Sequence, residues 1–389
     1  MINGNTCFDP TGRIPICAAG PEAKDHYMTS LFDRLKLGAI KLPNRIIMAP
    51  LTRARSNREG VPNELMALYY AQRASAGLII SEATGISREG LGYPDAPGLW
   101  SGEQVVGWRQ VTDAVHRQNG RIVAQLWHMG RLVHPLVSGM DAVSSSATAG
   151  PGYAYTYEGK TPYLEARAAT DADIERIVGD YVRAARNAML AGFDGVQIHG
   201  ANGYLVDQFL RDSANHRDDD YGGAIENRLR FARRVLEAVG NAIGMERVGI
   251  RFSPNILVQG VEDSDPIALY VELAKLLEEL KVPWIELREP YKPTSSGSVP
   301  TAPVSPAMRR HYAGQIVINS DHDWTDARHR IEGGTADAVS IGRLFIANPD
   351  LVTRFALDAP LNYGDQRTFY SGGAQGYIDY PMLGEQVAA

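Results

Sequence analysis

Residues 195–204 read Gly195-Val-Gln-Ile-His199-Gly-Ala-Asn202-Gly-Tyr204. A short, mostly apolar run ends here at a histidine, and an asparagine and a tyrosine follow within the next five residues. This pattern is typical of a buried strand that opens into a loop. Two hydrogen-bond donors and a phenol at such a point can polarise a carbonyl oxygen and protonate a neighbouring carbon.

The run at 195–198 is one of eight short apolar runs that are rich in β-forming residues. They span residues 45–49, 78–81, 122–126, 195–198, 248–252, 284–287, 315–318 and 338–341. The runs are continuous rather than alternating, which is typical of strands buried on both faces of a parallel sheet. We therefore expect eight parallel strands.

Helical patterns lie between or after these runs, at residues 62–76, 171–191, 227–242, 266–280 and 326–332. This alternation predicts an α/β fold, namely a (β/α)8 TIM barrel. An open, doubly wound sheet is the alternative. However, no Gly-x-Gly-x-x-Gly follows a strand, so a nucleotide-binding Rossmann unit lacks its main signal.

Two segments lie outside the alternation of strands and helices. Residues 35–43 predict a hairpin before the first barrel strand. Residues 131–169 are rich in Ser, Gly, Pro and Tyr, and they separate the third strand from its helix. Barrel enzymes keep their sites on the loop face at that end of the strands, so we expect this excursion to form a cap or lid.

Length and composition bound the domain organisation. A chain of 389 residues can form one large barrel or two smaller domains, and 44% apolar with 22% charged residues is typical of a globular protein. We expect residues 28–389 to form a single barrel domain. Residues 1–27 are expected to be a dispensable extension, since Met28 is a second possible start.

Charge and cysteine content exclude several classes of protein. The net charge of −6 gives no basic footprint for nucleic acid, and no apolar run is long enough to span a bilayer. Both cysteines, Cys7 and Cys17, lie near the start, which leaves no disulfide framework or Cys-based metal site in the core. We expect two idle thiols, with a Cys7–Cys17 disulfide as the alternative. No secretory signal is recognisable, so a cytoplasmic location is expected.

Chemically useful side chains gather at the ends of the expected strands, and in a barrel these ends converge on one site. They are Pro50, Leu51, Thr52 and Arg53, then Glu82, Ala83 and Thr84, then Gln125 and Trp127, then His199, Asn202 and Tyr204, and finally Arg251, Gly342 and Arg343. Among them, Thr52, Gln125, Arg251 and Arg343 suit a large planar anionic heterocycle. Amide and hydroxyl groups pair with ring edges, while a guanidinium serves a phosphate or an electron-rich ring.

Each of these residues also has a purely structural interpretation. A strand-end arginine can pair with a core carboxylate, Thr52 can cap a turn, and Gln125 can satisfy backbone groups. His199 and Trp127, taken singly, can be core residues. Their joint placement at six strand ends is what favours a functional site.

Six motifs lie along the chain, most of them at or near these ends. They are Met48-Ala-Pro-Leu-Thr-Arg53, Gln72-Arg-Ala-Ser-Ala-Gly-Leu-Ile-Ile-Ser-Glu-Ala-Thr84, Gln125-Leu-Trp-His-Met-Gly-Arg131, His199-Gly-Ala-Asn-Gly-Tyr-Leu205, Asp220-Tyr-Gly-Gly-Ala-Ile-Glu-Asn-Arg228 and Gly342-Arg-Leu-Phe-Ile-Ala-Asn-Pro-Asp-Leu351. Together they resemble the Old Yellow Enzyme family, from about Leu31 to the end of the chain. The resemblance implies a (β/α)8 barrel that holds FMN and reduces the C=C bond of α,β-unsaturated carbonyl or nitro compounds with NADPH or NADH.

The resemblance also implies a role for each matching residue. The FMN contacts would be Pro50, Leu51, Thr52, Ala83, Gln125, Arg251, Gly342 and Arg343. His199 and Asn202 would bind the electron-withdrawing group of the substrate, and Tyr204 would donate a proton after hydride arrives from the flavin. The substrate pocket would be lined by Trp127, Tyr93 and Tyr370, and no metal is expected.

One loop departs from the family pattern. After the seventh strand the family has a glycine-bearing loop whose backbone holds the FMN phosphate, whereas residues 319–325 contain no glycine and two aspartates. Glycine permits close backbone approach, and carboxylates repel a phosphate. His322 and Arg343 can offset that charge, but the phosphate contacts stay open.

Three other functions remain as alternatives. A dienoyl-CoA-reductase-like flavin enzyme expects an iron–sulfur cluster with its cysteines, and a metal-dependent hydrolase or lyase expects ligands at several strand ends, where only His199 qualifies. The third is a flavin-binding barrel that has lost turnover. Expected partners are activated alkenes and nicotinamide, with no nucleic acid and no membrane. The physiological substrate, the choice between NADPH and NADH, and the state as monomer or homodimer stay open.

Overall fold

The computed structural model describes residues 29–290, 302–320 and 322–385, so the expectation for residues 1–27 lies outside the described part. Eight parallel strands close into a barrel in sequence order. They are β3 (Ile46–Met48), β4 (Leu78–Gly85), β5 (Ile122–Trp127), β10 (Gly195–His199), β11 (Val248–Phe252), β12 (Trp284–Arg288), β13 (Gln315–Asn319) and β14 (Ala338–Ile341). All eight expected strands are confirmed, and the open doubly wound alternative is wrong.

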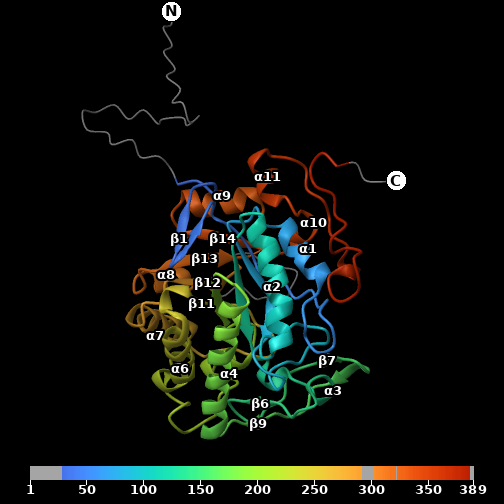
Figure 1. Ribbon diagram of the computed structural model, residues 1–389. Coiled ribbons are helices and arrows are strands. Elements are labelled where there is room, and N and C mark those ends of the chain that lie inside the picture. Colours follow the sequence, from blue (N-terminus) through green and yellow to red (C-terminus); the bar gives the residue numbers. More distant parts are fainter. Residues whose placement is uncertain (1–28, 291–301, 321, 386–389) are drawn as a thin grey trace, which may run out of the picture.

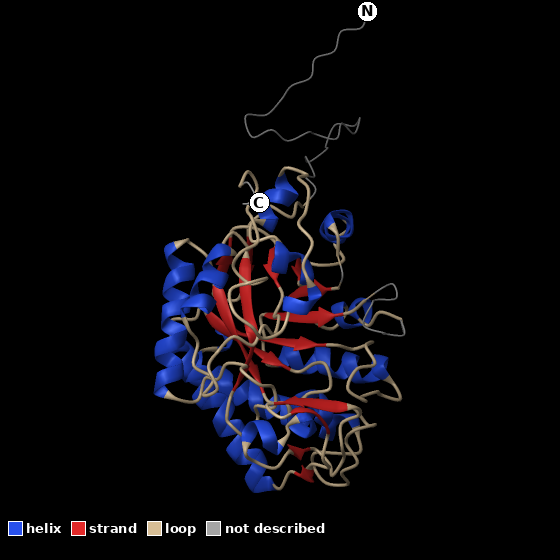
Figure 2. Ribbon diagram, turned by 90° about the vertical axis from the view of Figure 1, so that its right-hand side faces the viewer, coloured by secondary structure: helices blue, strands red, loops and turns tan. Residues whose placement is uncertain are grey.

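Helices cover the outside of this barrel (Figures 1 and 2). The longer ones are α1 (Glu64–Gln72), α2 (Gly102–Arg117), α4 (Asp171–Leu190), α6 (Ile225–Ile243), α7 (Pro266–Glu279) and α9 (Trp324–Glu332). Five were expected, with ends shifted by a few residues, while α2 was not assigned from the sequence. Its start carries a capping box between Ser101 and Gln104, which satisfies free backbone N–H groups at that end.

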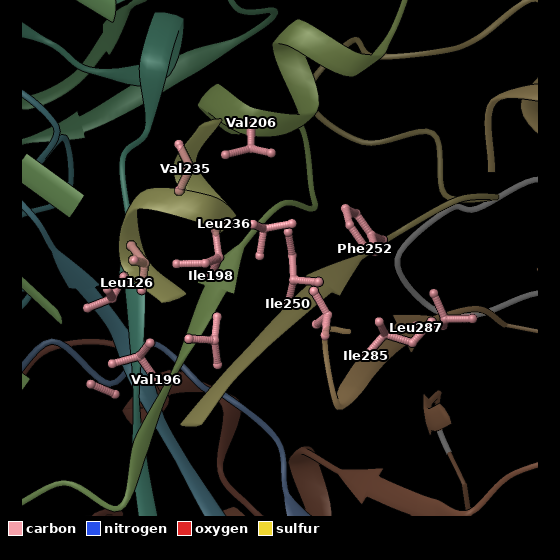
Figure 3. Close-up of a cluster of buried hydrophobic side chains, with 14 of the residues drawn as sticks. Leu126, Val196, Ile198, Val206, Val235, Leu236, Ile250, Phe252, Ile285 and Leu287 are labelled. Carbon is pink, nitrogen blue, oxygen red and sulfur yellow. The ribbon is translucent and has the colours of Figure 1, made fainter. Parts of the chain in front are cut away.

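The main core lies between the strands and these helices. Side chains on the outer face of β10 and β11 belong to one core cluster with those of α5 (Leu205–Leu210) and α6. Figure 3 shows Ile198 and Ile250 of the strands near Leu236 of α6, with Ile285 of β12 farther along the sheet. Because side chains alternate along a strand, the neighbours Gln197, Arg251 and Glu286 point into the barrel.

A β-hairpin, formed by β1 (Leu35–Leu37) and β2 (Ile40–Leu42), closes the end of the barrel where the strands begin, as the sequence predicts. Leu37 and Ile40 pack in one cluster with inward-facing residues such as Val123 and Trp284. The turn needs glycine, because Gly38 has φ of +57° and a Cβ there would stand 2.0 Å from the carbonyl oxygen of Glu246.

The excursion after β5 folds into a small cap. It contains η1 (Gly130–Leu132), α3 (Pro135–Ser138), β6 (Val143–Ser144), β7 (Tyr153–Thr156), β8 (Gly159–Pro162) and β9 (Arg167–Ala168). β7 and β8 pair as an antiparallel hairpin, and β6 pairs with β9. Across the described ranges, none of the helices combines the length and apolarity required to cross a membrane.

Candidate functional site

A cavity of about 920 Å³ lies at the carboxyl ends of the barrel strands, which is within the size range of small-molecule and cofactor sites. Most of the residues expected at the site line it, namely Pro50, Leu51, Thr52, Tyr93, Trp127, Asn202, Tyr204, Arg251, Gly342, Arg343 and Tyr370. They come from six strand ends and from the segment near the end of the chain. The structure therefore brings together residues as far apart in the chain as Pro50 and Tyr370.

Three expected residues are buried beside the cavity rather than among its lining residues. Ala83 and Gln125 are register partners on β4 and β5. The Gln125 Nε2 atom donates to Oε1 of Gln197, 2.7 Å away, so this amide belongs to a layer of polar side chains inside the barrel. His199 lies behind Tyr204, with ring centroids 4.9 Å apart.

The polar layer is organised by Glu286, a fully buried carboxylate that the sequence analysis did not single out. Its Oε1 atom accepts from Arg251 Nη1 at 2.5 Å, and its Oε2 atom accepts from Gln197 Nε2 at 2.9 Å. Ser340 also donates to it. Arg251 thus pairs with a core carboxylate, as its structural interpretation expects, and it lines the cavity as well.

The donors of the cavity fit an anionic ring system with hydrogen-bond acceptors. The lining includes Arg251, Arg288 and Arg343, and no Asp or Glu occurs among the described lining residues. The Nε of Arg251 and the Nε1 of Trp127 are buried and have no hydrogen-bond partner within the described chain. A buried donor without a partner is costly, so an acceptor from a bound ligand suits both atoms. FMN, with the carbonyl oxygens and nitrogens of its ring and with its phosphate, matches this donor set.

The loop after β3 is held by another buried carboxylate, Glu82. Its Oε2 atom accepts the backbone N–H groups of Arg53 and Ala54, at 3.1 and 2.9 Å. Burial raises the pKa of Glu82, and these N–H groups oppose the rise. Because both bonds fall directly after Thr52, Glu82 fixes the segment that carries this hydroxyl to the cavity wall.

His199 is poised as a neutral donor. Burial lowers its pKa well below the ordinary value of 6.5, and the charges of Arg251 and Arg288 lower it further. The backbone N–H of Ala201 donates to Nδ1 at 3.3 Å, so the proton of the neutral ring resides on Nε2. A neutral imidazole of this tautomer can donate one hydrogen bond without carrying charge.

Tyr204 stands in the angle between two other rings. Its ring is edge-on to Trp127, with centroids 5.0 Å apart, and edge-on to His199. Burial raises the pKa of the Tyr204 phenol, the neighbouring Tyr163 adds to this, and Arg288 opposes it. The phenol therefore keeps its proton at neutral pH and is available as an acid.

Asn202 and Arg288 form a pair that the sequence did not reveal. Arg288 Nη1 donates to the Oδ1 atom of Asn202 at 2.9 Å, and both residues line the cavity. The only signal in the sequence is a charged residue at the end of an apolar run, and nothing there names its partner 86 positions away.

Tyrosines from three parts of the chain lie together in the lining of the cavity. The Tyr93 ring lies 6.1 Å from Tyr155 of β7 and 6.3 Å from Tyr370. Burial raises the pKa of Tyr93 to about 12. Tyr155 confirms that the excursion after β5 caps the site. The sequence predicted the cap but not this residue, and it also missed Gln366 and Phe369, which line the cavity beside Tyr370.

The glycine-free loop meets the cavity at its first two residues, Asn319 and Ser320. Asp321 lies outside the described residues. The carboxylate of Asp323 accepts the backbone N–H of Asp326 at 2.9 Å and caps α9, and His322 is buried. One of the two acidic side chains is thus used to begin a helix.

Together the closed barrel and its cation-rich cavity define an α/β-barrel enzyme that acts on small molecules. A family model described as the NADH:flavin oxidoreductase / NADH oxidase family matches residues 30–362. The chain is 41% identical over 370 residues to 12-oxophytodienoate reductase 1 of Oryza sativa subsp. japonica, covering 90% of this chain and 92% of that relative.

Solved structures agree with this match. An Old Yellow Enzyme homologue from Zymomonas mobilis is 51% identical, with a TM-score of 0.90 over 91% of this chain and 100% of that chain. Morphinone reductase is 44% identical, with a TM-score of 0.88 over 92% of this chain and 98% of that chain. Another structure of morphinone reductase contains tetrahydroNAD.

The chain therefore belongs to the NADH:flavin oxidoreductase / NADH oxidase family, and its Old Yellow Enzyme resemblance is confirmed. It is an FMN-dependent oxidoreductase that uses a nicotinamide as reductant and acts as an ene-reductase.

Proposed function

We propose that the protein reduces the C=C bond of alkenes conjugated to a carbonyl or nitro group, and that His199, Asn202 and Tyr204 carry the chemistry beside the flavin. The observation that carries this proposal is the convergence of one neutral imidazole, one amide and one protonated phenol next to Trp127. Bound FMN supplies the hydride that adds to the β-carbon of the alkene.

Each of the three residues has a distinct task in this proposal. His199 Nε2 and the Nδ2 of Asn202 donate to the oxygen of the carbonyl or nitro group. Negative charge grows on that oxygen as hydride arrives, and removal of one fixed donor of this kind typically costs about 3 kcal/mol of barrier. Tyr204 then gives its phenolic proton to the α-carbon.

The cofactor is assigned to the wall built by β3, β4, β5, β11 and β14. We assign its contacts to Pro50, Leu51, Thr52, Ala83, Gln125, Arg251, Gly342 and Arg343. The pairing of Arg251 with Glu286 supports this assignment, because it leaves the Arg251 Nε atom without a protein partner. Trp127, Tyr93 and Tyr370 are assigned to the substrate side.

The finer biochemical properties are part of the proposal as well. Either NADPH or NADH serves as reductant, and the protein acts as a monomer or homodimer, as a single barrel domain over residues 28–389. A cytoplasmic location is supported by the sparse use of cysteine, with two in 389 residues.

The test is turnover of 2-cyclohexenone by protein loaded with FMN. NADPH consumption should match the formation of cyclohexanone measured by gas chromatography, and a nitroalkene should also be reduced. A yellow protein that oxidises NADPH with oxygen but leaves both alkenes unchanged would instead be a flavin-binding barrel without this turnover.

A further inference from the structure

Arg288 lies one level above the buried polar layer of the barrel, the layer that Glu286 organises. It is the last residue of β12, two positions after Glu286, so both side chains point to the same face of the strand. Glu286 is fully buried, whereas Arg288 is half-buried and lines the cavity. The strand therefore places the guanidinium of Arg288 at the base of the cavity, on the side assigned to the substrate.

The contact with Asn202 fixes which end of its amide faces a ligand. The Oδ1 atom of Asn202 accepts from Arg288 Nη1 at 2.9 Å, which leaves the Nδ2 atom as the donor for a substrate oxygen. The backbone of Asn202 is held separately, by a 2.7 Å bond from its N–H to Ser253 Oγ and by a left-handed φ of 57°. Arg288 thus orients the amide, while Ser253 holds the main chain.

The charges in the cavity support the same role. Of the three lining arginines, Arg251 is paired with Glu286, and Arg343 begins α10 (Arg343–Ala347) after β14. Arg288 alone among them bonds to a residue of the donor pair. A cation behind an amide strengthens its N–H donors by polarising the group, and in a low-dielectric site the effect is larger than in water.

We propose that Arg288 is a positioning residue for the donor pair: it holds Asn202 with Nδ2 toward the substrate oxygen and strengthens that donor. This inference rests on the proposed function, because it assigns the Arg288–Asn202 contact to the binding of an electron-withdrawing group. It also identifies substrate binding, rather than flavin binding, as the step that Arg288 serves.

The test is a double-mutant cycle on FMN-loaded protein, titrated with 4-hydroxybenzaldehyde and followed by flavin absorbance. Arg288→Gln should raise the Kd for this phenol by about tenfold, in the range expected for a hydrogen bond with a charged partner. Asn202→Ala should raise it by a similar factor. In the Asn202→Ala background, Arg288→Gln should add less than about twofold, because the group that Arg288 orients is gone.

Two further variants separate charge and structure from positioning. Arg288→Lys keeps the charge and a donor and should give a Kd between those of the parent and of Arg288→Gln. Arg186→Gln, which removes an exposed arginine from the outside of the barrel on α4, should leave the Kd unchanged. FMN content, from the ratio of flavin to protein absorbance, should be the same in all variants.

The outcomes distinguish this inference from the function on which it rests. Independent effects, in which Arg288→Gln raises the Kd equally with Asn202 present or absent, would overturn the positioning role and leave the proposed function intact. Loss of FMN from Arg288→Gln would overturn it too. Unchanged phenol binding in Asn202→Ala would overturn the proposed substrate site and this inference together.

Discussion

Arg53, in the loop after the first barrel strand, donates from Nε to the carbonyl oxygen of Phe369, 2.8 Å away and 316 positions later in the chain. The same guanidinium donates to the carbonyl oxygen of Gly376 and lies 5.0 Å from the ring centroids of Tyr69 and Tyr377, which stack on each other. This side chain ties the last segment of the chain to the strand ends. Figure 1 shows that segment, in red, beside α1 and α10.

Arg53→Met should therefore loosen the segment that brings Tyr370 to the cavity. A buried carbonyl left without its donor costs about 1–3 kcal/mol, so the free energy of unfolding should fall by about that much. Urea unfolding followed by fluorescence measures it. Arg186→Met on the outer face of α4 should change it by less than about 0.5 kcal/mol. Equal denaturation midpoints for Arg53→Met and the parent would contradict this account.

Arg251 and Glu286 should show separate structural and cofactor roles. Arg251→Met leaves Glu286 buried without its cation, which should cost about 3–5 kcal/mol of stability. Adding Glu286→Gln removes that charge and should recover most of the loss. FMN affinity, measured by quenching of flavin fluorescence, should stay weak in both variants. Recovery of FMN binding in the double variant would show that Arg251 does not contact the flavin.

Tyr204→Phe should separate the two halves of the reaction. Flavin reduction by NADPH should stay near the parent rate, because it needs no phenolic proton. Reoxidation by cyclohexenone should slow by about 10²–10⁴-fold, the range for losing a positioned acid. Nitroalkenes should lose less, since their nitronate is stable without protonation. Stopped-flow absorbance measures both halves, and a parent rate with cyclohexenone would assign the proton to solvent or another group.

The low pKa of His199 predicts how the stability of the protein changes with pH. Its pKa is well below 6.5 in the folded chain, so below pH 6.5 the unfolded chain binds a proton that the folded chain does not. Stability should therefore fall as pH drops through 6.5, by up to about 1.4 kcal/mol per pH unit from this residue. His199→Gln should lose less stability than the parent between pH 7.5 and 5.5, measured by urea midpoints. Identical pH slopes would contradict this, because they would mean that His199 binds its proton equally in the folded and the unfolded chain.

The features that could be predicted from the sequence are those that depend on a local pattern of residues. The barrel strands are continuous apolar runs, and the hairpin and cap are interruptions of a regular alternation. Glu286 and Arg288 were missed, although each is a charge within or beside such a run. Their roles depend on Arg251 of β11 and on Asn202 in the loop after β10, which become their neighbours only when the barrel closes.

Other misses have the same physical origin. Tyr155 lies in a segment predicted to be a cap, but which of its tyrosines faces the cavity depends on the register of the β7–β8 hairpin. Helix α2 is a different case, because Trp108, Val111 and Val115 lie at helical spacing and this local signal was overlooked. Gln366 and Phe369 reach the site in a segment that Arg53 holds, a contact that no short-range pattern contains.

The hairpin of β1 and β2 has a consequence for the order of events in catalysis. It seals one end of the barrel with Leu37 and Ile40, and the cavity lies at the opposite end. Nicotinamide and alkene must then enter the cavity from the same end and bind one after the other. We expect ping-pong kinetics, with parallel lines in double-reciprocal plots, and at high concentration each reactant should inhibit by competing with the other. Intersecting lines would require both to be bound at once.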